Sequence, residues 1–321
     1  MVQVANPIFP TSPTPTKQSF TQKLLEVDIT LGPNPQTNQP NQFGNGSNTV
    51  TLSGSRISAR VQAVGTLGTT AQVDVWGLTP SLLNELSTLG LAFSLVPQNT
   101  LSIRAGDAVS GLSTIFVGTV MSATGDYNQA PNVPMHFECF TDGLNSVIPL
   151  PASSFPQATD VGTIMSGLAS QMHLGFENNG VNVKLPPSYF VGSGVDQYRA
   201  VAAHANIEAA VVQGSLGNQV LAIWPRGKSR KSLPTVMLSP TTGLIGYPSY
   251  TAYGILVKAI FNPQIGFGGM INVKSSLPKA TGQWIILRLD HALDSVVPKG
   301  LWESSMWCYN PNYPIPSAPT S

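Results

Sequence analysis

The feature that most constrains this chain is a series of short segments in which apolar and polar residues alternate. Between residues 24 and 139 they are LLEVDITL, NTVTLSG, RISARVQAV, AQVDVWGL, NTLSIRAG, STIFVGTVMSA and VPMHFECF, each bounded by Gly, Pro, Asn or Asp. Alternation with a period of two and many β-branched residues are typical of strands with one buried face. The first part of the chain is therefore predicted to be a β-barrel or sandwich.

One stretch within this region, TPSLLNELSTLG, has a different period. Thr79 is suited to cap a helix, Pro80 occupies its first position, and Leu82, Leu83 and Leu86 follow at helical spacing. We therefore expect one short helix among the strands. Gly77, between the strand that precedes it and this helix, is expected to be a sensitive position where the chain turns sharply, provided that its φ is positive.

The middle of the chain, residues 153–236, is predicted to be a small inserted α/β domain. In DVGTIMSGLASQMHLG, Asp160 is a candidate N-cap for a helix whose apolar residues recur near helical spacing. GVDQYRAVAAHAN predicts a second helix, and IEAAVVQG and QVLAIWPRG return to strand-like alternation.

The remaining segments again predict strands: TAYGILVKAIF, GGMINVKSS, GQWIILRLDHAL and LWESSMWCY. The segments 1–23 and 310–321 are rich in Pro, Thr and Ser, lack apolar periodicity and are expected to form extended arms. The expected fold class is mainly β with a small α/β insert.

The 321-residue chain is poor in charge, with only 10% Asp, Glu, Lys and Arg against about 25% in ordinary soluble domains. So few ionic groups favour a surface that is partly covered by other subunits. The formal net charge is +1, and the only basic run, RGKSRK at 226–231, is interpreted as a solvated turn. Nucleic acid recognised by sequence and anionic lipid are therefore not expected partners.

The sequence contains neither a signal-peptide pattern at its start nor an 18-residue apolar span. We therefore expect the protein to be made in the cytoplasm and kept there or packaged from it, without a membrane partner. The two cysteines, Cys139 and Cys308, each end a strand-like run. In a reducing compartment they are expected to be buried free thiols.

Asp290, His291 and Asp294 form the densest group of ionisable residues and are the first candidates for a catalytic or metal site. On a strand, adjacent side chains point to opposite faces, so Asp290 and His291 diverge. Asp290 is expected to pair with Arg288, and His291 to lie in the core or at its rim, in line with Ile285, Leu287, Leu289 and Leu293. Asp294 is expected to open a turn, which makes the group the end of a hairpin.

No other pattern supports catalysis. The four histidines are widely separated, and the sequence lacks a metal-ligand spacing, a P-loop and a G-x-S-x-G elbow. VGSGVDQY, which is rich in Gly, is interpreted as a loop and helix start because it lacks the lysine of a phosphate-binding loop. We therefore predict no catalytic, cofactor-binding or metal-binding residue, no cofactor and no enzymatic activity.

Several motifs appear in a specific order along the chain. They are an aromatic-Gly strand end, a helix with an S-x-x-N-x-L-like run and an F-x-G-x-V strand, here Trp76 and Gly77, then Ser81, Asn84 and Leu86, then Phe116, Gly118 and Val120. This order resembles that of the baseplate hub proteins of contractile-tailed bacteriophages. GLIGYPSYTAYGILVKAIFNPQIGFGGMINVKSS and the closing hairpin also resemble the second barrel of such hubs. The resemblance spans most of residues 24–309.

The resemblance implies two β-barrels akin to tail-tube subunits in each chain, one from residues 24–145 and one from residues 146–152 and 237–309. It also implies a homotrimer that joins the six-fold tail tube to the three-fold central spike around an axial channel. The implied partners are further copies of the chain, the tail tube protein, the spike protein and other baseplate subunits. The implied location is the tail baseplate of the virion, assembled in the host cytoplasm.

Two other classes of protein remain open on the sequence. A carbohydrate-binding β module of a phage tail or fibre would use exposed aromatic residues, for which Trp224, Trp302 and Trp307 are candidates. Their strand-like contexts favour core packing instead. A hydrolase that degrades cell walls is the weaker alternative, because its motifs are absent.

Overall fold

The computed structural model describes most of the chain between residues 22 and 312. The described ranges are 22–34, 37, 39–44, 46–65, 68–87, 99–214 and 217–312. The N-terminal arm expected over residues 1–23 and the C-terminal arm expected over 310–321 lie largely outside these ranges.

The strands predicted before residue 140 are all confirmed. They are β1 (Lys23–Thr30), β2 (Thr49–Ser53), β3 (Ile57–Val64), β4 (Thr69–Trp76), β5 (Thr100–Asp107), β6 (Gly111–Gly125) and β7 (Pro134–Phe140). Buried and more exposed residues alternate along β1, β3, β4 and β5 as the period of two predicts. One face of each strand therefore belongs to a core.

The second β region follows the insert. Its four predicted strands are confirmed as β17 (Gly254–Ile260), β18 (Met270–Val273), β19 (Gly282–Ser295) and β20 (Trp302–Tyr309). Two further strands, β15 (Val236–Leu238) and β16 (Leu244–Thr251), were not predicted. A 3-10 turn at Pro278–Ala280 precedes β19.

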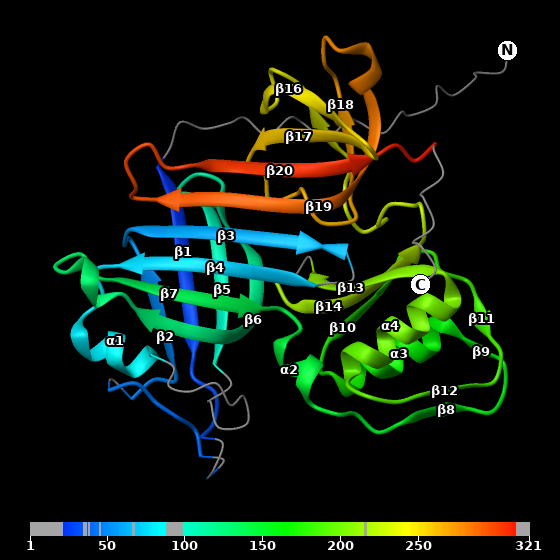
Figure 1. The fold of residues 1–321 in the computed structure, drawn as a ribbon, viewed down its shortest axis with the longest axis horizontal. Helices are drawn as coiled ribbons and strands as arrows, with labels where there is room; N and C mark the ends of the chain where they lie inside the picture. The colour runs from blue at the N-terminus through cyan, green and yellow to red at the C-terminus, as the bar shows by residue number, and fades with distance from the viewer. Residues whose placement is uncertain are drawn as a thin grey trace, which may run out of the picture.

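The two β regions form one continuous 13-stranded sheet (Figure 1). Its order is β16-β17-β20-β19-β3-β4-β7-β6-β5-β1-β2, with β18 and β15 branching from β19. The join is an antiparallel pairing of β3 with β19, which runs from Val64 opposite Arg288 to Ile57 opposite Ser295. The chain is therefore mainly β, and the described residues form no separate closed barrel.

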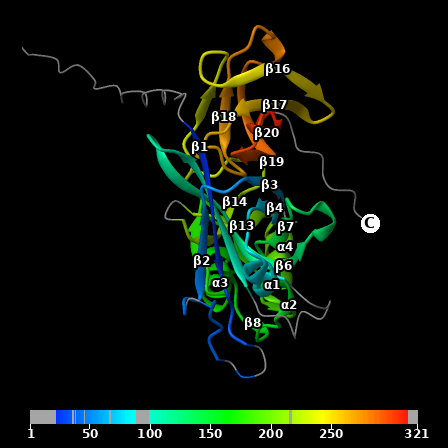
Figure 2. The ribbon, with the colours of Figure 1, turned by 90° about the vertical axis from the view of Figure 1, so that its left-hand side faces the viewer.

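Long strands carry the sheet around a corner. β6 pairs with β5 along its first part and with β7 from Thr119 onward. Figures 1 and 2 show β1, β2 and β5 running across β3, β4 and β7, so that two layers face each other. Such crossing of layers is typical of barrel-like sandwiches in which bent strands belong to both sheets.

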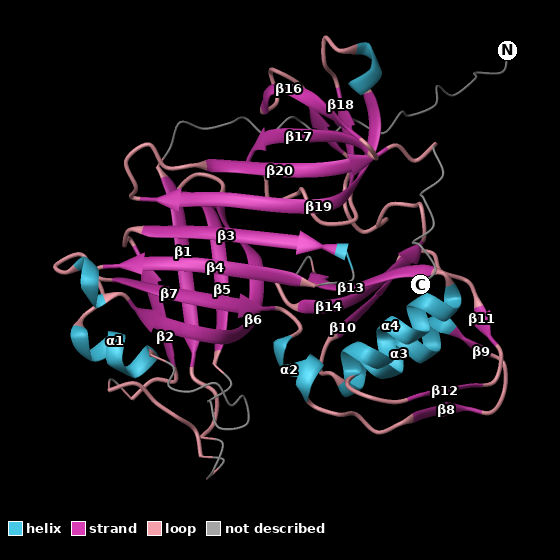
Figure 3. Cartoon of the chain, in the orientation of Figure 1, coloured by secondary structure: helices cyan, strands magenta, loops and turns pink. Residues whose placement is uncertain are grey.

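Few helices accompany the strands (Figure 3). The predicted short helix is α1 (Pro80–Leu86), and the Thr79 side chain accepts from the backbone N–H of Leu82, as expected of its N-cap. A 3-10 turn lies at Tyr127–Gln129, and α2 (Gly143–Val147) follows β7.

The insert contains the two predicted helices, α3 (Val161–Gln171) and α4 (Gly194–Ala205). Asp160 caps α3 as predicted, and Ser193 and Asp196 form a capping box at α4. Both helices lie beside a small sheet ordered β10 (Gly175–Asn178), β14 (Gln219–Pro225) and β13 (Ile207–Gln213) (Figure 1). Short pairs surround them: β8 (Ser153–Phe155) with β12 (Ser188–Phe190), and β9 (Thr159–Asp160) with β11 (Lys184–Leu185).

Three apolar clusters hold the fold together, one in each region. The insert is not isolated, because the two faces of β14 serve different clusters. Leu221 and Ile223 pack with the helices, whereas Val220, Ala222 and Trp224 belong to the core of the second β region. Burial on both faces explains why β14 is a nearly continuous apolar run rather than an alternating one.

The two β regions repeat one strand order. In the first region the ladder runs β3-β4-β7-β6-β5-β1, and in the second it runs β16-β17-β20-β19-β18-β15. Each strand occupies the same place in its ladder as its counterpart, and the counterparts also follow in the same order along the chain. One pairing differs in direction, since β1 and β5 are antiparallel whereas β15 and β18 are parallel.

The residue register repeats as well. Cys139 on β7 lies opposite Val120 on β6, and Cys308 on β20 lies opposite Ile286 on β19. In both long strands a β-bulge follows at the very next residue. Both cysteines are buried free thiols, as predicted, and they occupy equivalent positions in the repeated ladder.

Gly77 allows the strain of a side chain at a positive φ to be tested. Its φ is +85°, which meets the condition for a sensitive position, and nothing lies within 4 Å of the position that a Cβ would take. We expect Gly77→Val to lower the free energy of unfolding by about 1–2 kcal/mol, through backbone strain alone. Urea titration measures this. Gly77→Asn should cost clearly less, because Asn tolerates positive φ, and equal losses for both variants would contradict the strain argument.

Asp142 links the first β region to the insert. Its side chain is fully buried, and it accepts a hydrogen bond of 3.0 Å from the Tyr198 hydroxyl of α4. Burial raises the pKa of Asp142 to about 6, against an ordinary value of 3.8, although Tyr198 and the charge of Arg199 oppose the shift. The folded chain therefore retains a proton on this carboxyl at pH values where the unfolded chain has lost it.

The raised pKa predicts how stability varies with pH. Asp142 favours the folded state most below pH 3.8, and this contribution is lost as the pH rises to about 6. Relative to Asp142→Asn, the wild type should lose about 2 kcal/mol of unfolding free energy between about pH 4.5 and pH 7. Thermal melts of both proteins at the two pH values measure the difference. A difference that does not vary with pH would disprove the raised pKa.

Candidate functional surface

The sheet presents one continuous polar face. The eight strands from β16 to β6 in the sheet order turn alternate side chains away from the cores. On β3, β4, β7 and the later half of β19 these are mostly polar: Ser58, Arg60, Gln62, Thr70, Gln72, Asp74, His136, Glu138, Arg288, Asp290 and Asp294. We call the outward side of all eight strands the polar face.

Each Lys, Arg or His side chain on the polar face of the eight strands contacts a carboxylate. The contacts are Arg60–Asp294 at 2.8 Å, Arg288–Asp290 at 2.9 Å, Lys258–Glu303 at 3.5 Å and His136–Asp74 at 2.6 Å. Because these groups are partly exposed, each pair adds little to stability. Together these pairs leave the face hydrophilic but without a block of unbalanced positive charge. Tight binding of phosphates requires such a block of positive charge.

The structure separates Asp290 from His291, as strand geometry predicted. Asp290 accepts from the Arg288 guanidinium on the polar face. His291 is buried on the other face, 2.8 Å from the Ser304 hydroxyl and with its ring against Phe261. Burial lowers the pKa of His291 to about 4, so the imidazole is neutral at pH 7. The pair therefore cannot act as one site.

Asp294 closes the β19–β20 hairpin, as expected. Its carboxylate accepts from the backbone N–H of Leu301 across the turn and from Ser58 and Arg60 on β3. Although partial burial raises its pKa, these hydrogen bonds and the Arg60 charge lower it overall. Asp294 thus joins the hairpin to the first β region, and its role is structural.

One detail of the sequence interpretation is wrong. Leu287 was expected to share a buried face with Leu289 and His291, but its side chain is exposed. The β-bulge between Ile286 and Arg288 inserts one extra residue, so the alternation shifts and Ile286 takes the inward position. A bulge leaves no clear signal in a run of consecutive aliphatic residues.

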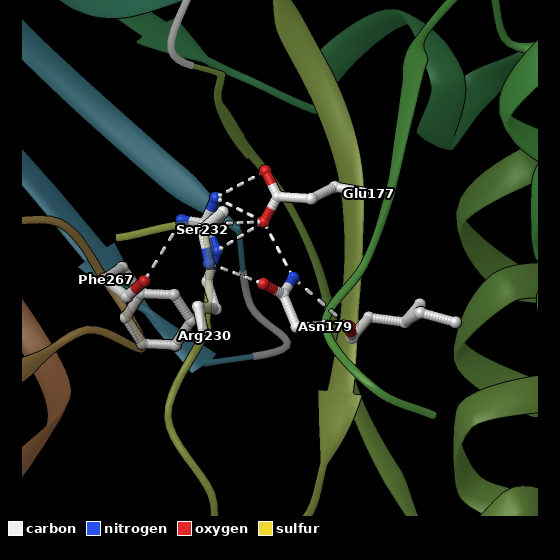
Figure 4. A network of polar contacts seen from close by, with 6 residues as sticks. Glu177, Asn179, Arg230, Ser232 and Phe267 are labelled. Atoms are coloured by element: carbon white, nitrogen blue, oxygen red, sulfur yellow. Dashed lines mark hydrogen bonds and ion pairs between the residues drawn. The ribbon is translucent and has the colours of Figure 1, made fainter. Parts of the chain in front are cut away.

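The interpretation of 226–231 as a solvated turn also needs a correction. Arg226, Lys228 and Lys231 are exposed, but the Arg230 side chain is only 3% exposed. Figure 4 shows its guanidinium against the Glu177 carboxylate of β10, with contacts of 3.0–3.2 Å. The burial of Arg230 was not predicted, because the sequence of a basic run does not indicate which of its residues points into the protein.

The Arg230 network fastens the insert to the second β region. Arg230 also donates to the Phe267 carbonyl, and Glu177 accepts from Asn179 and Ser232 (Figure 4). Partial burial raises the pKa of Glu177, but Ser232, Arg230 and Asn179 outweigh this and hold it below its usual range. Glu177 is therefore a charged structural partner.

A cavity of about 430 Å³ lies where the three regions meet, and its wall includes Glu177, Arg230, Gln213 and His291. Its charged groups already pair with each other, and His291 is bound to Ser304. Across the described ranges, no three His, Cys, Asp or Glu side chains gather closely enough to hold a metal ion. Among the described residues, no helix has the length and apolarity needed to span a membrane.

The tryptophans proposed for carbohydrate binding are used in packing. Trp224 is buried, Trp302 packs edge-to-face on Phe261, and the Arg288 guanidinium covers the Trp307 ring at 4.4 Å. The exposed aromatic residues of the second β region are instead Tyr247, Tyr250 and Tyr253, on or beside β16. The sequence interpretation had not singled out these tyrosines.

Comparisons with solved structures agree on the fold. The chain is similar to the 43 kDa tail protein of prophage MuSo2 from Shewanella oneidensis, with a TM-score of 0.57, 8% identity, and 89% of this chain and 97% of that one covered. It is also similar to the Escherichia coli c3393 protein, a type VI secretion component described as resembling T4 tail proteins gp27 and gp5. That match has a TM-score of 0.55 and 10% identity, and covers 80% and 74% of the two chains.

A third similar structure is the Francisella PdpA–VgrG complex, with a TM-score of 0.53, 11% identity, and coverage of 93% of this chain and 60% of that one. No curated protein matches the sequence. The model of the baseplate hub gp41 family matches residues 41–298, which is most of the chain. The chain therefore belongs to the baseplate hub gp41 family and is a structural component of the bacteriophage tail baseplate.

Proposed function

We propose that this hub protein forms a homotrimer that joins the six-fold tail tube to the three-fold central spike around an axial channel. Residues 24–145 would form one tube-like unit, and residues 146–152 with 237–309 the other, with 153–236 inserted. Further partners would be the tail tube protein, the spike protein and other baseplate subunits. The protein would act without catalysis and without a cofactor, in virions assembled in the host cytoplasm.

The repeated strand order is the observation that supports this proposal most. Two units with the same ladder, and with equivalent cysteines and bulges, give each chain two similar surfaces. Three such chains around one axis offer six similar surfaces to a six-fold partner while keeping three-fold symmetry. A single unit per chain would not reconcile the two symmetries.

The polar face supports the channel. Its hydrophilic side chains suit a wall in contact with water, and its cations are paired with carboxylates. A nucleic acid passing such a wall would meet no stretch of unpaired positive charge to hold its phosphates. The proposed channel therefore permits passage of the genome without recognition of its sequence.

The oligomeric state tests this function directly. Light scattering of the purified full chain should give three times the 33.9 kDa of one chain, and averaged electron micrographs should show a three-fold ring with a central opening. A monomer at all concentrations, or a closed ring with another symmetry, would contradict the proposal.

A carbohydrate-binding module remains the second candidate because of three exposed tyrosines. Tyr247, Tyr250 and Tyr253 are 72%, 55% and 68% exposed and lie on one hairpin, β16–β17. Sugar rings commonly stack on such aromatic faces. Binding of cell-surface glycans by the wild type but not by Tyr247→Ala, from a protein that stays monomeric, would favour this candidate over the hub.

A further inference from the structure

Three exposed tyrosines mark one edge of the 13-stranded sheet. β16 ends the strand order, and in the described part of the chain no strand pairs with its outer side. Tyr247 and Tyr250 lie on β16, and Tyr253 lies in the turn that leads to β17; all three are more than half exposed. Apolar residues exposed singly are normal, whereas a group of large ones marks an interaction site. We call these three residues the tyrosine edge.

The backbone of β16 is unsuited to the addition of a regular strand. A β-bulge interrupts its pairing with β17 between Ile245 and Ser249, and Gly246 within the bulge has a φ of +64°. Pro248, in the same segment, has no backbone N–H to donate. Bulges and prolines are devices that prevent strand addition at a sheet edge. A partner of the tyrosine edge therefore has to bind mainly through side chains.

The C-terminal arm, residues 310–321, leaves the sheet close to the tyrosine edge. The last strand, β20, lies beside β17, and β17 lies beside β16 (Figure 1). Cys308, Ile255 and Tyr250 are opposite one another on these three strands. Two strand spacings, about 10 Å, therefore separate the end of β20 from Tyr250. Three extended residues span about that distance, and the structure describes the chain as far as Asn312.

The sequence of the arm is of a kind that aromatic surfaces bind. Residues 311–314 are PNYP and residues 316–319 are PSAP, which are two P-x-x-P motifs in succession. Such segments favour the polyproline II helix, which has three residues per turn and no internal hydrogen bonds. Prolines three residues apart therefore share one face. Aromatic side chains recognise P-x-x-P in this form, because the preformed helix loses little entropy on binding.

We propose that residues 313–319 fold back on the tyrosine edge of their own chain as a polyproline II segment. The first P-x-x-P motif meets Tyr250 at the end of β16 next to the exit of the arm, and the second runs on toward Tyr247. A polyproline II segment needs no ladder of backbone hydrogen bonds, so the bulge and Pro248 do not hinder it. The covered edge is closed to strand addition by other chains. The contact goes beyond the proposed function and does not depend on it, since it lies within one chain.

Spacing and tether both suit this contact. Tyr247 and Tyr250 are three residues apart, up to about 10 Å along a strand, and one polyproline II turn rises about 9 Å. Successive turns of the arm therefore meet successive tyrosines. Because a few residues join the arm to β20, its local concentration at the edge is about 1 mM. A site with a Kd of about 0.1 mM is then filled in about nine of ten chains.

Nitration of tyrosines by tetranitromethane tests the contact on the full chain, with each tyrosine followed by mass spectrometry of its peptide. Tyr250 should react about tenfold more slowly in the wild type than in the double variant Pro314→Gly with Pro319→Gly, because the arm covers it. The matched control is Tyr189, an exposed tyrosine on the insert, which should react equally in both proteins. Equal nitration of Tyr250 in the two proteins would overturn the contact.

A second readout follows the arm itself. Ile315 lies between the two motifs, and its methyl NMR signal, assigned with Ile315→Val, should be as broad in the full chain as the signals of the folded core. Tyr250→Ala should sharpen this signal to that of a free segment, whereas Tyr189→Ala should leave it unchanged. A signal that is already sharp in the wild type would contradict the contact.

Mixed samples distinguish the chain's own arm from the arm of a neighbouring copy. The proline variant, made heavy with nitrogen-15, is refolded together with light wild type and then nitrated. If each arm covers its own chain, heavy Tyr250 reacts fast and light Tyr250 stays protected. Equal, intermediate rates for heavy and light Tyr250 would mean that arms are exchanged between copies, which overturns the contact within one chain.

Light scattering of the same samples separates this contact from the proposed function. A monomer whose Tyr250 is protected by its own arm supports the contact and overturns the proposed trimer. A trimer in which Tyr250 reacts equally in the wild type and the proline variant overturns the contact and leaves the hub function standing. A monomer without protection of Tyr250 overturns both.

Discussion

The pairing of β3 with β19 is the contact on which the rest of the architecture depends. It joins residues 57–64 to residues 288–295 through eight antiparallel pairs and so makes one sheet of two β regions that are distant in sequence. Asp294 reinforces the join through Arg60 and Ser58. The pairing also brings residues of each β region into the core of the other, since Leu293 of β19 belongs to the first core and Ala63 of β3 to the second. Without this pairing, β3 would be an exposed edge, which proteins generally cover or disrupt.

The equivalent bulges explain how two long strands serve two layers each. A bulge adds one residue to a strand and increases its local twist. In β6 and β19 the bulge falls near the point where the strand passes from one partner to the next. The same device, beside equivalent buried cysteines, positions the later part of each strand along the polar face. The shared geometry therefore supports a common origin for the two β units.

The insert is tied to both β units by polar contacts and by shared packing. Tyr198 binds Asp142, Gln219 donates to the carbonyls of Val117 and Thr141, and Arg230 joins Glu177 to the Phe267 carbonyl. Buried polar groups of this kind are costly when a partner is lost. The insert therefore has its own helix-packed core, yet its position relative to the sheet is set by specific pairs.

The sequence by itself determined most strands of the large sheet, the helices with caps at Thr79 and Asp160, the sharp turn at Gly77 and the divergence of Asp290 from His291, because these depend on local periodicity and sterics. Only the tertiary structure decided that β3 meets β19, that Leu287 is bulged outward, that Arg230 turns inward and that Tyr250 stays exposed. These features depend on residues brought together from distant parts of the chain. Alternation states which face of a strand is buried, but it does not state which strand lies alongside.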